Sequence, residues 1–438
     1  MALPADTNWE VQTTGSDLNG GGFSTANKGA TGVDMTYGAG LAVTSFTSTL
    51  SAVGTTALTD SAAGFLNTML GNVINIVGQG LYCIKGFTST SIVTVDRALG
   101  TFATTSGKVG GAFAGVGLAG SGAVSALMTT HVQSGAYSIT TATPNVSGGP
   151  YSSSAACNVI GYNSTRLDGG TKPVLTANAA LAGIIIVTAS STYSVVSNLD
   201  VDCNSNTTST GINSSAGALY GGVFDCIARN AVTGFSGDSR CFRCTAVGCT
   251  TGFTIDTVDW CYASGGTTGF TSAYCRSSVA YDCSGKGFSG YSYAYNCVAY
   301  SCGATGFYNT NASRAYWLVN CISYGNTGYG FRSDSDGFET LINCAAGSNS
   351  SGAQLGFTQV LGLIALSGDP FTNAAGGDFS LDTTAGEGAL CRAAGFPTSF
   401  NAAATNVYRD VGAAQHQDPA GGAGGLLTHP GMAGGMRG

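Results

Sequence analysis

Short apolar or alternating segments, separated by glycine, asparagine and serine, follow one another along most of the chain. Alternation with a period of two residues is typical of strands, and turn residues mark their ends. The pattern therefore predicts many short strands. In the first third of the chain they cover residues 56–65, 72–78, 80–86 and 91–96. Further along they cover residues 136–139, 158–162, 183–188, 195–203 and 377–381.

One segment has the helical period instead. Val124, Leu127, Met128 and His131 are spaced i, i+3, i+4 and i+7, so they form one face of a short helix over residues 121–131. We expect this helix to cap the first turn of the body that follows, because an uncovered sheet end recruits other chains. We interpret His131 as the edge of that packed face, because no partner for acid–base catalysis is close in sequence.

A Gly-Phe pair recurs through the second half of the chain, with phenylalanine spacings of 18, 17, 18, 19, 24 and 26 residues. Repetition at such a period is the signature of a repeat architecture. The pairs are Gly234-Phe235, Gly252-Phe253, Gly269-Phe270, Gly287-Phe288, Gly306-Phe307, Gly330-Phe331 and Gly356-Phe357.

Cysteine and tyrosine repeat with the same period. The first cysteine column opens short apolar segments at Cys226, Cys244, Cys261, Ser278, Cys297, Cys321 and Cys344. The second column, five residues later, contains Cys249, Cys283 and Cys302. The third column contains Tyr281, Tyr300 and Tyr324.

These columns predict a parallel β-helix, in which each turn of the chain stacks on the last at about 4.8 Å and equivalent residues form ladders. Cysteine is small and often buried, so it suits an inward ladder, and phenylalanine fills the interior. Glycine before phenylalanine permits a sharp corner. A leucine-rich or helical solenoid lacks support in the residue pattern, and a β-propeller needs a longer period of about 40–45 residues.

The cysteines have three open interpretations: a buried thiol ladder, which we favour, disulfides, or a zinc site. Cys241 and Cys244 form a CxxC motif that Cys249 follows, but residues three apart on a strand point to opposite faces. No second CxxC follows, as a zinc site would need. The histidines of the chain are His131, His416 and His429.

The pattern divides the chain into four parts. We predict a β-rich N-terminal attachment domain over residues 1–112 and the parallel β-helix, with its capping helix, over residues 113–383. An irregular C-terminal cap follows over residues 384–417, and a Gly-rich tail over residues 418–438.

Composition removes several classes of protein. Hydrophobic residues make up 43% of the 438 residues and only 9% are charged, which excludes ordinary disorder, and 8 prolines exclude collagen. The net charge of −7, without a basic cluster, argues against nucleic-acid binding. The start MALPADTNWE lacks the features of a signal peptide, and the aliphatic run 183–187 is too short to cross a membrane. We expect synthesis in a cytoplasm and no membrane partner.

Aspartate pairs are the candidates for glycoside hydrolysis, which needs two carboxylates at a suitable separation. Residues i and i+2 of a strand share a face, so Asp200 can pair with Asp202, and Asp334 with Asp336. The remaining candidates are Asp256 with Asp259, and Asp282. Neither i, i+2 pair has an aromatic-rich sugar platform near it, because Trp260 and Trp317 are isolated. Because acids are sparse and also common in turns, we predict no catalytic residue, metal site or cofactor, and no enzymatic activity. A glycosidase or polysaccharide lyase is the alternative.

Several stretches resemble known proteins. The predicted helix and strand, residues 158–170 (NVIGYNSTRLDGG) and residues 196–202 (VSNLDVD) resemble right-handed parallel β-helix proteins of the pectate-lyase-like class. The opening residues 9–23 (WEVQTTGSDLNGGGF) and the segments 377–381 and 410–415 are similar to bacteriophage virion proteins of that class. The resemblance implies a tailspike, head fibre or capsid decoration, commonly a trimer.

We therefore predict a structural phage virion protein, a stiff capsid decoration or fibre that attaches to the particle through its N-terminal domain. The alternative is a receptor-binding tailspike that binds or cleaves host surface polysaccharide. A bacterial adhesin is a third reading, disfavoured by the missing signal peptide. The expected partners are two further copies of the chain in a homotrimer, the major capsid or other virion proteins and, for the alternative, a host surface glycan. Low surface charge and the aliphatic residues 184–187 favour the trimer.

Overall fold

Among the described residues, almost all of the regular secondary structure is β-strand. The structure is a computed structural model, and it describes residues 3–4, 6–36, 43–115, 129–139, 145–146, 158–179, 184–187, 195–205, 209–214, 221–290, 292–309, 316–334, 338–382, 386–392, 394–396 and 410–414. Within these ranges the α-helical structure is limited to α2 (Glu387–Cys391), and no helix is long and apolar enough to cross a membrane. The predicted all-β fold is confirmed.

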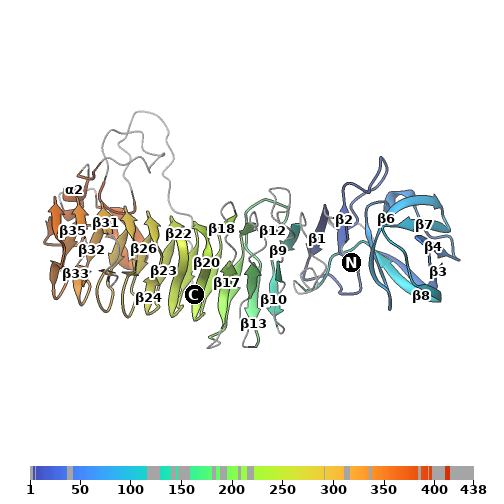
Figure 1. The fold of residues 1–438 in the computed structure, drawn as a ribbon, viewed down its shortest axis with the longest axis horizontal. Helices are drawn as coiled ribbons and strands as arrows, with labels where there is room; N and C mark the ends of the chain where they lie inside the picture. The colour runs from blue at the N-terminus through green and yellow to red at the C-terminus, as the bar shows by residue number, and fades with distance from the viewer. Residues whose placement is uncertain are drawn as a thin grey trace. The chain divides into compact units, whose positions relative to one another are not determined.

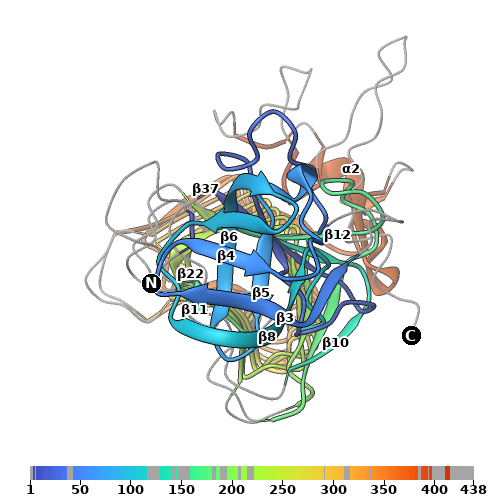
Figure 2. The same ribbon diagram turned by 90° about the vertical axis from the view of Figure 1, so that its right-hand side faces the viewer.

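Two compact units make up the chain, Met1–Asn204 with Ile212–Gly222, and Ser205–Gly211 with Val223–Gly438. The first unit contains a closed antiparallel barrel with the strand order β3-β4-β7-β6-β5-β8, which faces the viewer in Figure 2. Its strands are β3 (Thr44–Val53), β4 (Ala57–Asp60), β5 (Val73–Ile76), β6 (Gly80–Ser89), β7 (Ile92–Val95) and β8 (Thr101–Val109).

The barrel has its own apolar core. Alternate residues of its strands, among them Leu50, Ile74, Ile84 and Val93, point inward and are completely buried. Closure pairs each strand on both sides, which removes exposed sheet edges. The four strands predicted between residues 56 and 96 are confirmed as β4–β7, and they belong to this small β domain in the N-terminal part of the chain. The bounds 1–112 and the attachment role stay predictions.

The first unit also contains parallel strands. β1 (Thr7–Val11) pairs with β9 (Thr129–Gln133), which in turn pairs with β12 (Asn158–Tyr162). β2 (Gly22–Ser24) pairs with β1 in the antiparallel sense. The start of the chain therefore lies in the parallel stack rather than in the barrel. The other parallel strands are β10 (Ala136–Ile139), β11 (Asn145–Val146), β13 (Val174–Ala177), β14 (Ile185–Val187), β15 (Val195–Ser197), β16 (Asp200–Asp202) and β17 (Thr210–Ser214).

The prediction of a capping helix over residues 121–131 is wrong for residues 129–131, which the structure describes. Residues 121–128 lie outside the described residues, and residues 129–131 belong to strand β9. The β-branched residues Thr129, Thr130 and Val132 favour a strand, and β9 is hydrogen-bonded to a strand on each side. Tertiary pairing here overrides the helical spacing of the apolar residues.

In the second unit, successive turns of the chain add strands to three parallel stacks. The cysteine stack contains β19 (Ile227–Arg229), β21 (Thr245–Val247), β23 (Tyr262–Ser264), β26 (Val279–Tyr281), β29 (Val298–Tyr300), β32 (Ile322–Tyr324), β35 (Ala345–Gly347) and β38 (Ile364–Leu366). Figure 1 shows strands of successive turns, such as β23, β26, β32 and β35, following one another along its horizontal axis. The phenylalanine stack contains β24 (Thr268–Phe270), β27 (Phe288–Ser289), β30 (Phe307–Asn309), β33 (Tyr329–Ser333) and β36 (Gly352–Leu355).

The third stack carries tyrosines on its outward side, and we call it the tyrosine stack. Its strands are β18 (Gly222–Phe224), β25 (Tyr274–Arg276), β28 (Tyr293–Tyr295), β31 (Tyr316–Val319), β34 (Glu339–Ile342) and β37 (Gln359–Leu361). Two long strands, β20 (Thr233–Phe242) and β22 (Thr251–Asp259), continue from the phenylalanine stack into the tyrosine stack. The predicted parallel β-helix is therefore confirmed.

The Gly-Phe pairs form an inward ladder. Neighbouring rings have centroids 4.6–5.2 Å apart, and each side chain is completely buried. The ladder consists of Phe235, Phe253, Phe270, Phe288, Phe307 and Phe331. The prediction that Phe357 is the seventh member of this ladder is wrong. Strand β36 ends at Leu355, so Gln354 lies opposite Phe331 and Phe357 falls on the connection to β37.

The first cysteine column is a buried thiol ladder, as we favoured. Cys297, Cys321 and Cys344 carry free thiols and are completely buried. The Cys321 and Cys344 thiols each donate a hydrogen bond of 3.4 Å to a main-chain carbonyl of the preceding turn. The second column is also buried at Cys283 and Cys302. These thiols satisfy carbonyl groups and fill space between turns.

A left-handed residue precedes each position of the first cysteine column, with φ between +47° and +58°. These corner residues are Asp225, Arg243, Trp260, Ser277, Asn296, Asn320 and Asn343. Asparagine tolerates this conformation better than most residues do. The corner at Arg243 also corrects our reading of the CxxC motif. Because the chain turns there, Cys241 and Cys244 are both buried inside rather than on opposite faces.

The C-terminal segment packs against the outward side of the cysteine stack. β39 (Phe371–Asn373) and β40 (Asp378–Leu381) form an antiparallel pair, so the predicted strand 377–381 exists but does not close a turn of the helix. The Phe379 ring lies 5.8 Å from the rings of Tyr281 and Tyr300, which places the predicted tyrosine column under this segment. The described part of the predicted cap joins the same core, and residues 415–438 lie outside the described residues.

Candidate functional site

Four residues before the first cysteine column, a series of outward side chains crosses the tyrosine stack. Thr257 is opposite Tyr274, Tyr274 is opposite Tyr293, and Tyr293 is opposite Trp317. Tyr274 and Trp317 are 42% and 45% exposed, although large aromatic residues are usually buried. These residues form an aligned outward aromatic series on adjacent turns, with exposed rings at Tyr274 and Trp317.

The sequence orients these side chains through the residues between them. Successive side chains of a strand point to opposite faces. Val258, Cys275, Ala294 and Leu318 follow the outward residues directly, are in register with one another, and are completely buried. Their burial in the interior forces the residues on either side to point outward.

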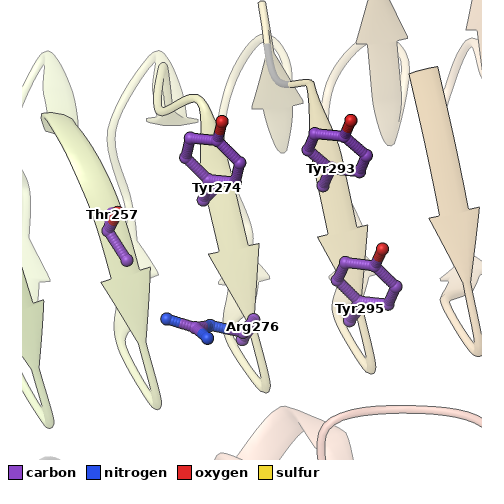
Figure 3. A pocket seen from close by; sticks show the side chains of 5 residues that line it. All are labelled: Thr257, Tyr274, Arg276, Tyr293 and Tyr295. Atoms are coloured by element: carbon purple, nitrogen blue, oxygen red, sulfur yellow. The ribbon is translucent and has the colours of Figure 1, made fainter. Parts of the chain in front are cut away.

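Three tyrosines present nearly parallel rings, and we call Tyr274, Tyr293 and Tyr295 the tyrosine platform. The Tyr274 and Tyr293 centroids are 5.4 Å apart with planes 10° apart, and those of Tyr293 and Tyr295 are 6.3 Å apart with planes 5° apart. Figure 3 shows all three rings projecting from β25 and β28 on the same side. Trp317 continues the series with its ring at 74° to that of Tyr293. The platform is apolar on its ring faces and polar at its hydroxyl groups.

The platform borders a shallow hollow of about 410 Å³, which Thr257 and Arg276 also line (Figure 3). This volume is within the range of small-molecule and oligosaccharide-sized sites. Burial, as the largest cause, raises the pKa of Tyr295. Its phenol therefore stays protonated around neutral pH and remains a hydrogen-bond donor.

A buried carboxylate fixes the charged edge of the hollow. Asp259 is 5% exposed and receives hydrogen bonds from Arg240 Nε at 2.8 Å and from Arg276 Nη2 at 3.0 Å. Arg276 Nε also donates to the second carboxylate oxygen of Asp259. Since each oxygen already accepts from a guanidinium group, Asp259 positions Arg276 beside the platform. Bidentate arginine–carboxylate pairs of this kind hold the guanidinium plane in a fixed orientation.

The predicted pair of Asp256 and Asp259 is not brought together as a catalytic pair. Asp256 is exposed and accepts a hydrogen bond from the Thr257 hydroxyl at 3.3 Å, whereas Asp259 is buried in its arginine contacts. Asp282 occupies a left-handed turn with φ +50° and is exposed. Asp282 is therefore a turn residue, which agrees with the expectation that acidic residues are also common in turns.

Asp334 is held in an ion pair. Arg332 donates to both of its oxygens at 2.8 Å, and the Tyr308 hydroxyl donates to one of them at 2.7 Å. These contacts, with Arg332 first, lower the pKa of Asp334, so it is ionised at neutral pH and unsuited to donate a proton. Its predicted partner Asp336 lies outside the described residues.

The structure places Asp200 and Asp202 on the same side of β16, opposite Val174 and Thr176 of β13. Both are half-buried. The expected sharing of one face is confirmed for this pair. The main-chain amide of Asn204 donates to Asp202 at 2.8 Å, a turn contact that gives this carboxylate a local structural role.

His131 has charged neighbours that are distant in sequence. It lies opposite Glu10 in the β1–β9 pairing, and Arg166 forms an ion pair with Glu10. Burial first, and then the charge of Arg166, lowers the pKa of His131 to about 4. His131 is therefore a neutral buried residue at neutral pH. The other two histidines, His416 and His429, lie outside the described residues.

The two tryptophans occupy different kinds of position. Trp260 occupies a left-handed corner, with φ +58°. Trp317 is not isolated, because it is in register with Tyr293. The signal for this face was present in the sequence: Tyr274, Tyr293 and Trp317 each lie four residues before the first cysteine column. We predicted the inward columns and missed this outward one.

No family model matches the chain, and no curated protein matches its sequence. Among solved structures, the catalytic domain of GH87 alpha-1,3-glucanase in complex with nigerose is similar, with 10% identity and a TM-score of 0.32 over 68% of this chain and 86% of that chain. A variant of that catalytic domain in complex with nigerose has 11% identity and a TM-score of 0.32 over 76% of this chain and 92% of that chain.

These neighbours are all catalytic domains, and this finding contradicts our prediction that the chain has no enzymatic activity, which we withdraw. None of them is described as a virion protein. At such low identity and TM-score the likeness carries no argument about the residues or the substrate of this chain. The function is therefore argued from the geometry of its own side chains.

Proposed function

We propose that the chain binds a polysaccharide on the outward side of the tyrosine stack. The observation that carries this proposal is the outward aromatic series on three adjacent turns, in which Tyr274 and Trp317 are exposed and Tyr293 is half-buried. A sugar ring has an apolar C–H face and a polar rim, so it fits a ligand site that combines aromatic faces with a few placed polar groups. Thr257 and Arg276 supply such groups beside the platform.

The ligand lies across the strands rather than along them. Residues that share a column are one turn apart, about 4.8 Å in a β-sheet, which is close to the length of one pyranose unit in an extended chain. Each turn of the tyrosine stack therefore offers a ring to one sugar unit. A polysaccharide that follows the column meets Tyr274, Tyr293 and Trp317 in succession.

The virion role remains part of the proposal. It is supported by the resemblance of residues 9–23, 377–381 and 410–415 to bacteriophage β-helix proteins. Between the two virion roles, the outward tyrosine platform favours a tailspike that binds host surface polysaccharide over an inert capsid decoration. The homotrimer and the contact with capsid proteins belong to the same proposal. Immunogold labelling of purified particles tests the virion part separately from glycan binding.

The test is a binding titration of the full chain against a panel of purified bacterial surface polysaccharides, with release of reducing ends measured in parallel. We expect at least one polysaccharide to bind, and Tyr293→Ala to weaken its binding about tenfold, which corresponds to about 1.4 kcal/mol. Tyr329→Ala is the matched control, because Tyr329 lies on β33 in the phenylalanine stack.

The outcomes separate clearly. Equal loss of binding in Tyr293→Ala and Tyr329→Ala would show that the platform is not the binding surface. Absence of binding to every polysaccharide in the panel would overturn the proposed function. Release of reducing ends by the wild-type chain would add cleavage to binding and would start a search for its carboxylates on the same face.

A further inference from the structure

A second group of polar side chains lies on the outward side of the phenylalanine stack, away from the tyrosine platform. It consists of Lys286, Tyr308, Arg332 and Asp334, and we call it the cation cluster. The Lys286 Nζ atom lies 3.9 Å from the centroid of the Tyr308 ring, and the Arg332 guanidinium carbon lies 5.3 Å from it. One aromatic ring thus contacts two positive charges, which come from the turns before and after its own, as cation–π contacts allow.

The carboxylate of the cluster is fully engaged. Asp334 accepts two hydrogen bonds from Arg332 and one from the Tyr308 hydroxyl. Those contacts orient the Arg332 guanidinium, whose side chain is still 37% exposed. Asp334 therefore acts as a positioning residue for Arg332, which explains why a prominent acid here is unsuited to catalysis.

Lys286 differs from Arg332 in its contacts. In the part of the chain that the structure describes, no ion pair joins Lys286 to a carboxylate, and its ammonium group faces the Tyr308 ring. Burial first, and then the positive charge of Arg332, lowers its pKa. The two cations therefore repel each other, and Asp334 offsets only one of the two positive charges.

We propose that the cation cluster binds an anionic group with several oxygen acceptors, a sulfate ester or a carboxylate, carried by a polysaccharide. An oxyanion at the cation cluster supplies the missing negative charge, and the Lys286 ammonium and the Arg332 guanidinium are both donors of charge-assisted hydrogen bonds. The chain carries a net charge of −7, so a polyanion is repelled by the protein as a whole and is attracted only by a local positive group. This site is separate from the tyrosine platform and does not depend on the function proposed there.

The test is a titration of the full chain with dextran sulfate, and with unsulfated dextran of the same length, at low ionic strength. We expect dextran sulfate to bind and dextran not to bind. Lys286→Gln and Arg332→Gln should each weaken binding about tenfold, while Lys286→Arg, which keeps the charge, should retain it. Lys85→Gln removes the same charge from an exposed position of the barrel and serves as the matched control.

Failure of dextran sulfate to bind would overturn the proposal, and so would an equal loss in Lys85→Gln, which would indicate attraction by overall charge. Competition by inorganic sulfate at an equal concentration of sulfate groups would show a site for the free anion and overturn the polysaccharide part. Thermal unfolding of each variant shows whether it is folded. If a glutamine variant is not folded, the binding of dextran sulfate by Lys286→Arg still tests whether the charge at position 286 is sufficient.

Discussion

The interior of the β-helix and the outward side of its tyrosine stack both carry aromatic columns, but the columns differ in kind. The interior repeats one residue, phenylalanine, over six turns, and each ring is completely buried. The outward column changes from Thr257 through Tyr274 and Tyr293 to Trp317 in four turns. Uniform repetition satisfies packing, because every turn meets the same neighbours. Change along a column, with exposed rings, indicates a surface that has to match something outside the protein.

The largest expected effect comes from the interior. Phe288→Ala removes a ring that stacks on Phe270 and Phe307 at 4.7 and 4.6 Å and leaves a cavity between turns. We expect the free energy of unfolding to fall by about 3–5 kcal/mol. Urea denaturation followed by fluorescence measures this loss. Phe338→Ala, at a position 77% exposed, is the control and should change stability by no more than about 0.5 kcal/mol.

A similar loss in both variants would mean that the inward column is not the main source of stability, and the contrast between the two columns would fail. A loss of stability in Phe288→Ala alone would support the contrast between the inward and outward columns.

The second expected effect concerns the stability that depends on His131, a residue that is buried rather than exposed to solvent. His131 points to the side that carries Glu10, and it is neutral because burial and the charge of Arg166 lower its pKa to about 4. The unfolded chain binds a proton below its usual pKa of about 6.5, so the native state loses up to about 3 kcal/mol as the pH falls from 6.5 to 4. Above pH 6.5 this contribution is fully present.

The pH dependence of unfolding of wild type and His131→Gln measures this effect. Glu10, whose pKa is raised chiefly by burial, gives the opposite slope, since its protonated form is favoured in the native state and stability falls as the pH rises. The difference between the two proteins therefore isolates the histidine. Parallel stability curves between pH 4 and 6.5 would contradict the assignment of His131 as a buried neutral residue.

The smallest expected effect is on the open face. Tyr274→Ala removes a ring that is 42% exposed and contacts Tyr293 across the strands. Cross-strand pairs of this kind contribute about 0.2–1 kcal/mol, so the variant should unfold almost as the wild type does. Urea denaturation of this variant beside Phe288→Ala measures the difference directly. A loss above about 2 kcal/mol would place Tyr274 among the residues that hold the fold and weaken its reading as a binding residue.

Much of the fold was predictable because its interior is repetitive. The Gly-Phe pairs and the first cysteine column gave the turn length and the inward ladders, and both agree with the structure. Prediction failed where contacts between distant segments decide the outcome. Residues 129–131 form a strand because β1 and β12 flank them, and β40 packs against Tyr281 and Tyr300 rather than closing a turn.

The candidate site was only partly predictable. Tyr274, Tyr293 and Trp317 share one spacing from the cysteine column, so their common face could have been found from the sequence. The role of Asp259 could not, because Arg240 and Arg276 belong to the preceding and following turns, and only the register between turns brings the three together. Isolated acids in the sequence therefore overstate the number of candidates for catalysis.

The left-handed corners before the first cysteine column have a consequence for how such a protein grows. Each turn of the second unit carries its own corner residue, so its bend is set locally and does not depend on the length of the preceding loop. Recombination that copies the segment from one corner to the next would add a complete turn, with its own inward thiol and its own outward side chains. Each copy would then be free to acquire a new outward residue, so that the recognition surface lengthens by small genetic steps while the interior stays the same.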